Sequence, residues 1–167
     1  MFYILMIPFL SGCTTVSWKE AFQTCQTPRD ICNVVSRNLT SKETPSRNWS
    51  PAEKIWSRGE ADCKDYATCV VNACKEKGLN ASIVLYYPPN LKLGHAVVIG
   101  TYQGKMWMSS NGEYSNVQNL TAAKQSVAYF LSCKPTKLWE VKYQYTRPED
   151  PILNQLAVTK PGGGREN

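Results

Sequence analysis

Cys63 is the residue of this chain with the clearest means of nucleophilic chemistry. A cysteine thiol is a poor nucleophile until its surroundings favour the thiolate. Two arrangements favour it: the N-terminus of a helix, whose dipole stabilises an anion, and a nearby imidazolium. The sequence offers both, because Cys63 precedes a helical pattern and a single histidine, His95, is available to pair with it. The two residues therefore predict thiol chemistry with His95 as the proton acceptor.

The elements around these two residues follow from the pattern of apolar side chains. Apolar residues recur at helical spacing over residues 66–77, Asp62 can cap the first turn, and Gly78 can end the helix. Cys63 therefore opens a buried helix. Beyond it, apolar and β-branched runs bounded by Gly, Pro and Asn predict strands. We expect strands at residues 81–87, 95–99, 105–110 and 138–146, the last at an edge, further helices at residues 18–25 and 121–131, and a loop at residues 41–47.

A third polar group is needed to orient the imidazole, and two neighbouring residues at the end of the third strand can supply it. The side-chain carbonyl of Asn111 can accept the imidazole N–H and fix its tautomer, as in a Cys-His-Asn triad. The hydroxyl of Ser110 is the alternative, and we favour Asn111 slightly. Asn111-Gly112 is about equally typical of a plain hairpin turn, so the sequence leaves this role open.

Two blocks of sequence around Cys63 and His95 resemble a known family. Ala61-Asp62-Cys63-Lys64-Asp65-Tyr66-Ala67 resembles the Gly-Asp-Cys-Glu-Asp-Tyr-Ala block of the bacterial transglutaminase-like cysteine peptidases, part of the papain-like transglutaminase-core superfamily. Gly94-His95-Ala96-Val97 resembles their Gly-His-Ala-Val block. Trp49-Ser50-Pro51 and Trp56 resemble the segment upstream of the nucleophile, so the likeness covers residues 49–111.

The resemblance implies an α+β fold, a papain-like transglutaminase core in which the nucleophile helix packs on a small antiparallel sheet. It also implies an exported thiol hydrolase, a cysteine peptidase or amidase that acts by Cys-His acyl transfer on a peptide or protein amide. The oxyanion would then meet the backbone N–H of Cys63 and a group from residues 56–61, for which Trp56 and Ala61 are the candidates. We expect no cofactor and no metal.

Two departures from the family pattern bear on function. The family usually has an aspartate at the end of the third strand, where this chain has Ser109-Ser110-Asn111. Some relatives bind calcium through acidic residues around the nucleophile, and Lys64 stands where the family often has glutamate. The missing aspartate keeps open a catalytically inactive transglutaminase-fold lipoprotein that serves as a binding module. A protein-crosslinking transglutaminase and a structural lipoprotein held by disulfides are further alternatives.

The N-terminus predicts export. Residues 1–9 are apolar but shorter than the roughly 20 residues that span a bilayer, so they are typical of a signal peptide. Leu10-Ser11-Gly12-Cys13 resembles a bacterial lipoprotein processing box, in which Cys13 would carry the lipid that anchors the protein in the periplasm or cell envelope. No Lys or Arg precedes the apolar run, and a hydrophobic strand with an ordinary Cys13 is the alternative.

Seven cysteines are many for a reduced cytosolic chain of this length, which agrees with export. If Cys13 carries lipid and Cys63 is the nucleophile, the others cannot all pair, and at least one stays free. The expected disulfides join Cys25 to Cys32, and Cys133 to Cys69 or Cys74. None of the cysteine spacings is typical of a zinc site.

Composition and length describe one globular domain. Apolar residues make up 43% of the chain and charged residues 19%, and the net charge of +6 is spread along the sequence. No nucleic-acid-binding motif is present, so we expect no nucleic-acid partner. We expect a monomer whose substrate is a peptide or protein, with the proteins of the envelope among the candidates. The predicted segments are a signal (1–13), an N-terminal extension (14–48), a catalytic domain (49–158) and a disordered tail (159–167).

Overall fold

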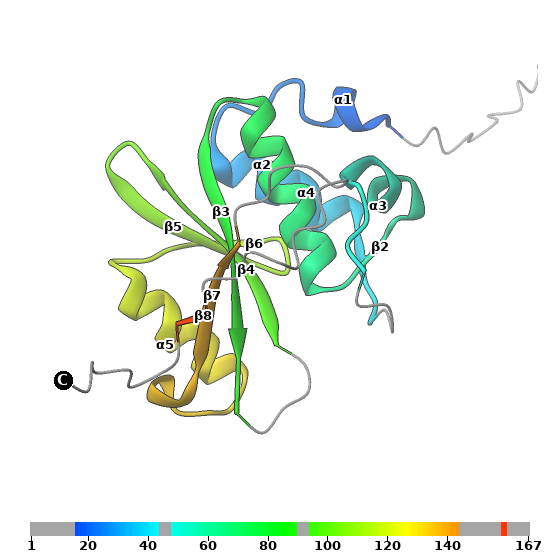
Figure 1. Ribbon diagram of the computed structural model, residues 1–167. Coiled ribbons are helices and arrows are strands. Elements are labelled where there is room, and N and C mark those ends of the chain that lie inside the picture. Colours follow the sequence, from blue (N-terminus) through cyan, green and yellow to red (C-terminus); the bar gives the residue numbers. More distant parts are fainter. Residues whose placement is uncertain (1–15, 44–47, 90–93, 144–157, 160–167) are drawn as a thin grey trace, which may run out of the picture.

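The computed structural model describes residues 16–43, 48–89, 94–143 and 158–159. Its largest element is an antiparallel sheet with the strand order β6-β5-β4-β3-β7-β8 (Figure 1). The strands are β3 (Asn80–Tyr87), β4 (His95–Tyr102), β5 (Lys105–Ser110), β6 (Glu113–Asn116), β7 (Trp139–Tyr143) and β8 (Val158–Thr159). Two short parallel strands, β1 (Thr40–Ser41) and β2 (Glu60–Ala61), form a second sheet.

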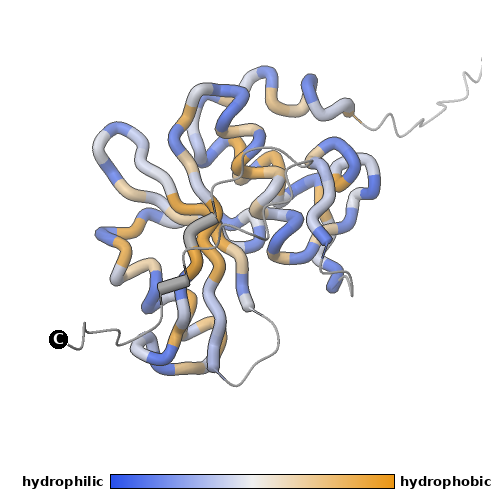
Figure 2. Tube along the Cα trace, in the orientation of Figure 1, coloured by the Kyte–Doolittle hydropathy of each residue, from blue (hydrophilic) through white to orange (hydrophobic). Residues whose placement is uncertain are grey.

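Helices cover both faces of the large sheet. On one side lie α1 (Trp18–Ala21), α2 (Pro28–Asn38), α3 (Ala52–Arg58) and α4 (Cys63–Glu76), and on the other lies α5 (Leu120–Phe130), followed by the 3-10 turn η1 (Pro135–Lys137). Successive side chains of a strand point to opposite faces, so Val98 of β4 joins the core cluster that contains α4, whereas Val97 joins the cluster that contains α5. Figure 2 shows apolar residues concentrated where the helices meet the middle of the sheet.

Helix α4 begins at Cys63 because the preceding residue caps it. The carboxylate of Asp62 accepts the backbone N–H groups of Lys64 and Asp65, each at 3.1 Å, and the side chain of Asp65 completes the capping box. Gly78, at a φ of 68°, follows the last turn in the left-handed conformation that glycine favours. The predicted nucleophile helix is therefore confirmed. With the antiparallel sheet beneath it, the fold is α+β, as expected.

Most predicted strands are confirmed, with ends that differ by a few residues. β4 runs on through Gly100 to Tyr102 instead of ending at residue 99, because its pairing with β3 and β5 continues beyond the glycine. A side chain at Gly100 would collide with the indole of Trp107 and the backbone of Asn80, so only glycine fits there. β7 corresponds to the predicted edge strand, but it lies between β3 and β8 and is not an edge. Its predicted end at residues 144–146 and part of the predicted loop, residues 44–47, lie outside the described residues.

Helix α2 was missed by the sequence prediction, which treated Cys25 and Cys32 as a disulfide-closed loop. Thr27 accepts the N–H of Asp30 at 3.1 Å, and the Asp30 carboxylate accepts the N–H of Thr27 at 2.9 Å. These two bonds form a capping box, and Pro28 occupies the first turn of the helix. Both features can be recognised in the sequence. The helix buries Cys32 completely and carries the N-terminal residues into the same core as α4.

The expected disulfides are not formed, since all six described cysteines are free. Cys69 and Cys74 are buried in the cluster on the α4 side of the sheet, whereas Cys133 packs against the cluster on the α5 side. The sheet therefore separates the proposed partners. Cys13 lies outside the described residues. Within the described part of the chain, no helix combines the length and the apolar character needed to cross a membrane.

Candidate active site

The thiol of Cys63 lies against strand β4. Its sulfur accepts hydrogen bonds from the backbone N–H groups of Ala96 and Lys64. Ala96 directly follows His95 along β4, so the packing of α4 on the sheet brings the predicted nucleophile to the neighbour of the predicted base. Cys63 therefore lies next to the residue that follows His95, although 33 positions separate Cys63 from Ala96 in the sequence.

The start of α4 leaves one backbone donor beside the thiol. Asp62 accepts the N–H groups of Lys64 and Asp65 through its carboxylate, and that of Tyr66 through its carbonyl. The N–H of Cys63 is not used by this cap. An N–H at the first position of a helix points along the axis toward solvent or ligand and carries the positive end of the helix dipole. It is therefore suited to meet a developing oxyanion.

His95 is buried at the first position of β4, with its ring held on two sides. Its Nε2 lies 2.8 Å from the Oγ of Ser110 on β5, and its ring centroid lies 4.5 Å from that of Phe130 at the end of α5. Phe130 could not be identified from the sequence, because α5 is far along the chain and belongs to no motif. Close packing explains the glycine that precedes His95. A Cβ atom at Gly94 would lie 2.7 Å from the carbonyl oxygen of Tyr86.

Of the two candidates for the orienting group, Ser110 is the one that contacts the imidazole. The antiparallel register pairs Ser110 with Val97, which places its hydroxyl on the face that His95 shares. Asn111 instead enters the turn at a φ of 49°, and its Oδ1 is buried without a hydrogen-bond partner among the described residues. The slight preference for Asn111 in the sequence therefore does not match the contact in the structure.

Burial sets the protonation of the pair. It lowers the pKa of His95 to about 4, and it raises the pKa of the Cys63 thiol although the N–H of Ala96 and the charge of Lys64 oppose it. At neutral pH the thiol of Cys63 and the imidazole of His95 are therefore both neutral. The buried thiols of Cys32 and Cys74 are shifted further, to pKa values of about 11 and about 12.

The two residues predicted to help hold the oxyanion lie on α3 and in β2. The indole N–H of Trp56 donates to the carbonyl of Val16 at 2.9 Å, and its ring packs against those of Trp18 and Phe22. Trp56 thus anchors the N-terminal residues on α3. Ala61 is fully buried in β2, two positions before the nucleophile.

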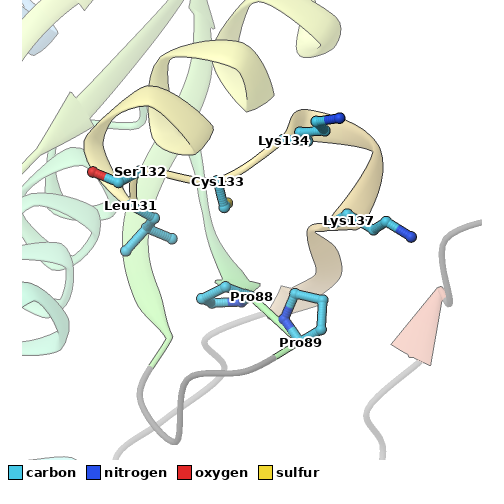
Figure 3. A pocket seen from close by; sticks show the side chains of 7 residues that line it. All are labelled: Pro88, Pro89, Leu131, Ser132, Cys133, Lys134 and Lys137. Atoms are coloured by element: carbon cyan, nitrogen blue, oxygen red, sulfur yellow. The ribbon is translucent and has the colours of Figure 1, made fainter.

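A cavity of about 470 Å³ lies on the α5 side of the sheet. Figure 3 shows Leu131 and Cys133 across from Pro88 and Pro89, and the rest of its lining is Ser132, Lys134 and Lys137. Neither Cys63 nor His95 lines it. Leu131, which lines the cavity, directly follows Phe130 in the chain.

Comparison with known proteins identifies the fold. No family model matches the sequence, and no curated protein matches it. Two solved structures of Legionella pneumophila LapG match the structure, one of them described as EGTA-treated, with TM-scores of 0.55 for that structure and 0.53 for the other. Each is 11% identical and covers 77% of this chain, and the matches span 70% and 71% of the LapG chains. This chain has the transglutaminase-like fold of LapG.

Proposed function

We propose that this chain is a thiol hydrolase, a cysteine peptidase or amidase that cleaves a peptide or protein amide. The observation that carries the proposal is the thiol of Cys63, which opens a capped helix and lies against the residue that follows His95. The hydrogen bond between His95 Nε2 and the Ser110 hydroxyl supports Ser110 as the third member. The LapG-like fold supports the same reading at the level of the transglutaminase-like class.

The first half of the reaction forms a thioester. Cys63 Sγ attacks the amide carbon while its proton passes to His95, and the carbonyl oxygen becomes an oxyanion beside the N–H of Cys63. One such donor is worth about 3 kcal/mol of transition-state stabilisation. Because Nε2 faces Ser110, Nδ1 is the ring atom assigned to this proton. His95 then protonates the leaving amine as the C–N bond breaks.

The second half of the reaction releases the product. Water attacks the thioester carbon as His95 takes one of its protons, the C–S bond breaks, and the thiol of Cys63 recovers its proton from the imidazole. An amine in place of water would give transamidation by the same steps. We favour water because the sequence blocks resemble those of hydrolases. On the N-terminal sequence alone, we further propose an exported monomer anchored through a lipid on Cys13.

Selective alkylation tests the proposed function. With iodoacetamide at neutral pH and peptide mass spectrometry, we expect Cys63 to react far faster than the fully buried Cys32, Cys69 and Cys74. Cys133, which is only half-buried, serves as the reference for simple exposure. His95→Gln should slow the alkylation of Cys63 and leave that of Cys133 unchanged. If His95→Gln changed the alkylation rates of Cys63 and Cys133 by the same factor, the result would favour a catalytically inactive binding module.

Ser110→Asp is expected to shift the pH profile of Cys63 alkylation toward lower pH. A carboxylate beside Nε2 stabilises the imidazolium, so the thiolate–imidazolium pair forms more readily. Opposite charges at such distances move pKa values by about one to three units. Asn111→Asp adds the same charge one residue away, without a side-chain bond to the ring, and should shift the profile less. If both variants shifted it equally, Ser110 would have no special role.

A further inference from the structure

Four charged side chains surround the first turn of α4. The ammonium of Lys64 contacts the carboxylate of Asp62 and lies 4.0 Å from Oδ1 of Asp65. The Nη2 of Arg58 lies 2.6 Å from Oδ2 of Asp65. The side chains of Lys64 and Asp62 are only 14% and 15% exposed, and that of Asp65 is 3% exposed. Two cations therefore balance two carboxylates, and only the Arg58 side chain, at 34% exposed, has substantial access to solvent.

These carboxylates are the ones that fix the start of the nucleophile helix. Asp62 caps α4 through the N–H groups of Lys64 and Asp65, and Asp65 reaches back toward the N–H of Asp62. Two like charges this close would repel each other without cations between them. The position of Cys63 thus depends on what neutralises Asp62 and Asp65.

A divalent cation does not fit this place. Calcium needs about six to eight oxygen ligands, most of them carboxylates and carbonyls. The family that the sequence resembles includes members that hold calcium through acidic residues around the nucleophile, and one LapG match was treated with EGTA, a calcium chelator. In this chain the ammonium of Lys64 already contacts both carboxylates, and it adds a positive charge where a further acidic ligand would stand.

We propose that Lys64 is a positioning residue that acts as the built-in counter-ion of α4, so that the helix start and the reactivity of Cys63 do not depend on calcium. The proposal rests on the proposed function of Cys63 as the nucleophile. Lys64 also acts on that thiol directly. Its backbone N–H donates to the sulfur, and its positive charge lowers the pKa of Cys63, whereas the charge of Asp62 raises it.

Lys64→Gln separates charge from packing, because glutamine keeps much of the stem and loses the ammonium. We expect Cys63 to alkylate at least about threefold more slowly at neutral pH, with its pH profile moved to higher pH, since a thiolate without a nearby cation forms less readily. Lys54→Gln makes the same change on the exposed surface of α3 and should leave the profile unchanged. A Lys64→Gln profile identical to that of wild type would overturn the proposal.

Thermal unfolding gives a second readout that needs no activity. A bound ion stabilises the folded state by mass action, so a calcium-dependent protein melts higher in CaCl₂ than in EGTA. We expect the melting temperature of wild type to be the same in CaCl₂ as in EGTA. The melting temperature of Lys64→Gln should likewise not differ between the two solutions. Lys64→Glu places a third carboxylate beside Asp62 and Asp65 and should melt higher in CaCl₂ than in EGTA.

The outcomes distinguish this inference from the proposed hydrolase. Stabilisation of wild type by calcium would overturn the role of Lys64, whatever Cys63 does. A folded Lys64→Glu variant that ignores calcium would also overturn it, because the three side chains would then not face a common point. Suppose instead that Cys63 alkylated no faster than its exposure explains, while the melting temperatures behaved as expected. The proposed thiol hydrolase would then be contradicted, and the proposed role of Lys64 as a counter-ion would be supported.

Discussion

Replacing Cys63 by alanine is expected to abolish hydrolysis of any amide that the wild-type protein cleaves. The proposed reaction passes through a thioester on Sγ, and the hydroxyl that contacts the imidazole, that of Ser110, is assigned to hold the ring. Removing the nucleophile of a Cys-His pair removes the chemical path and leaves only binding. Release of product from a peptide library, followed by mass spectrometry, measures the effect.

The same change should leave stability nearly unaltered, which makes the loss of activity interpretable. Cys63 is half-buried at the first position of α4, and alanine is the best helix former. Asp62 keeps its cap with the N–H groups of Lys64 and Asp65. The matched control is Cys133→Ala, which removes another half-buried thiol and should keep full activity. Residual hydrolysis by folded Cys63→Ala would show that the central assignment is wrong.

The local part of this site could be predicted from the sequence. Helix α4 and its first residue follow from one capping box and one apolar period, both contained in consecutive residues. The strand that carries His95 is likewise a short apolar run entered through Gly94. Interactions within a few residues therefore determine where the thiol and the imidazole sit on their own elements.

The non-local part could not be predicted in the same way. Whether Ser110 or Asn111 meets the ring depends on the register of β4 with β5, and a shift of one residue would exchange their faces. The separation of Cys133 from Cys69 and Cys74 by the sheet depends on the position of α5. The contact of Phe130 with His95 has the same origin. Helix α2 is the exception, because its capping box was local and was overlooked.

His95→Ala is expected to lower the rate by about 100-fold to 10,000-fold, the contribution of a general base. In the resting pair both groups are neutral, so the thiol must lose its proton to His95 as it attacks. Without the imidazole, solvent has to accept that proton. His95→Gln keeps a polar side chain of similar size and should lose a comparable factor, which separates the loss of the base from the loss of packing.

The acid side of the pH profile identifies the base more directly. The base acts only when it is deprotonated, and burial lowers the pKa of His95 to about 4, so kcat/KM should hold through pH 6.5 and fall as the pH drops toward 4. The contribution of this pKa shift to folding stability is fully present above pH 6.5 and is lost between there and pH 4, because the unfolded chain binds the proton more tightly. His95 is the single histidine, so its ring protons in an NMR titration report this pKa without ambiguity. A loss of only a few-fold in folded His95→Ala would return His95 to an ordinary core residue. An acid limb of kcat/KM that does not follow the pKa measured by NMR would show that His95 is not the base.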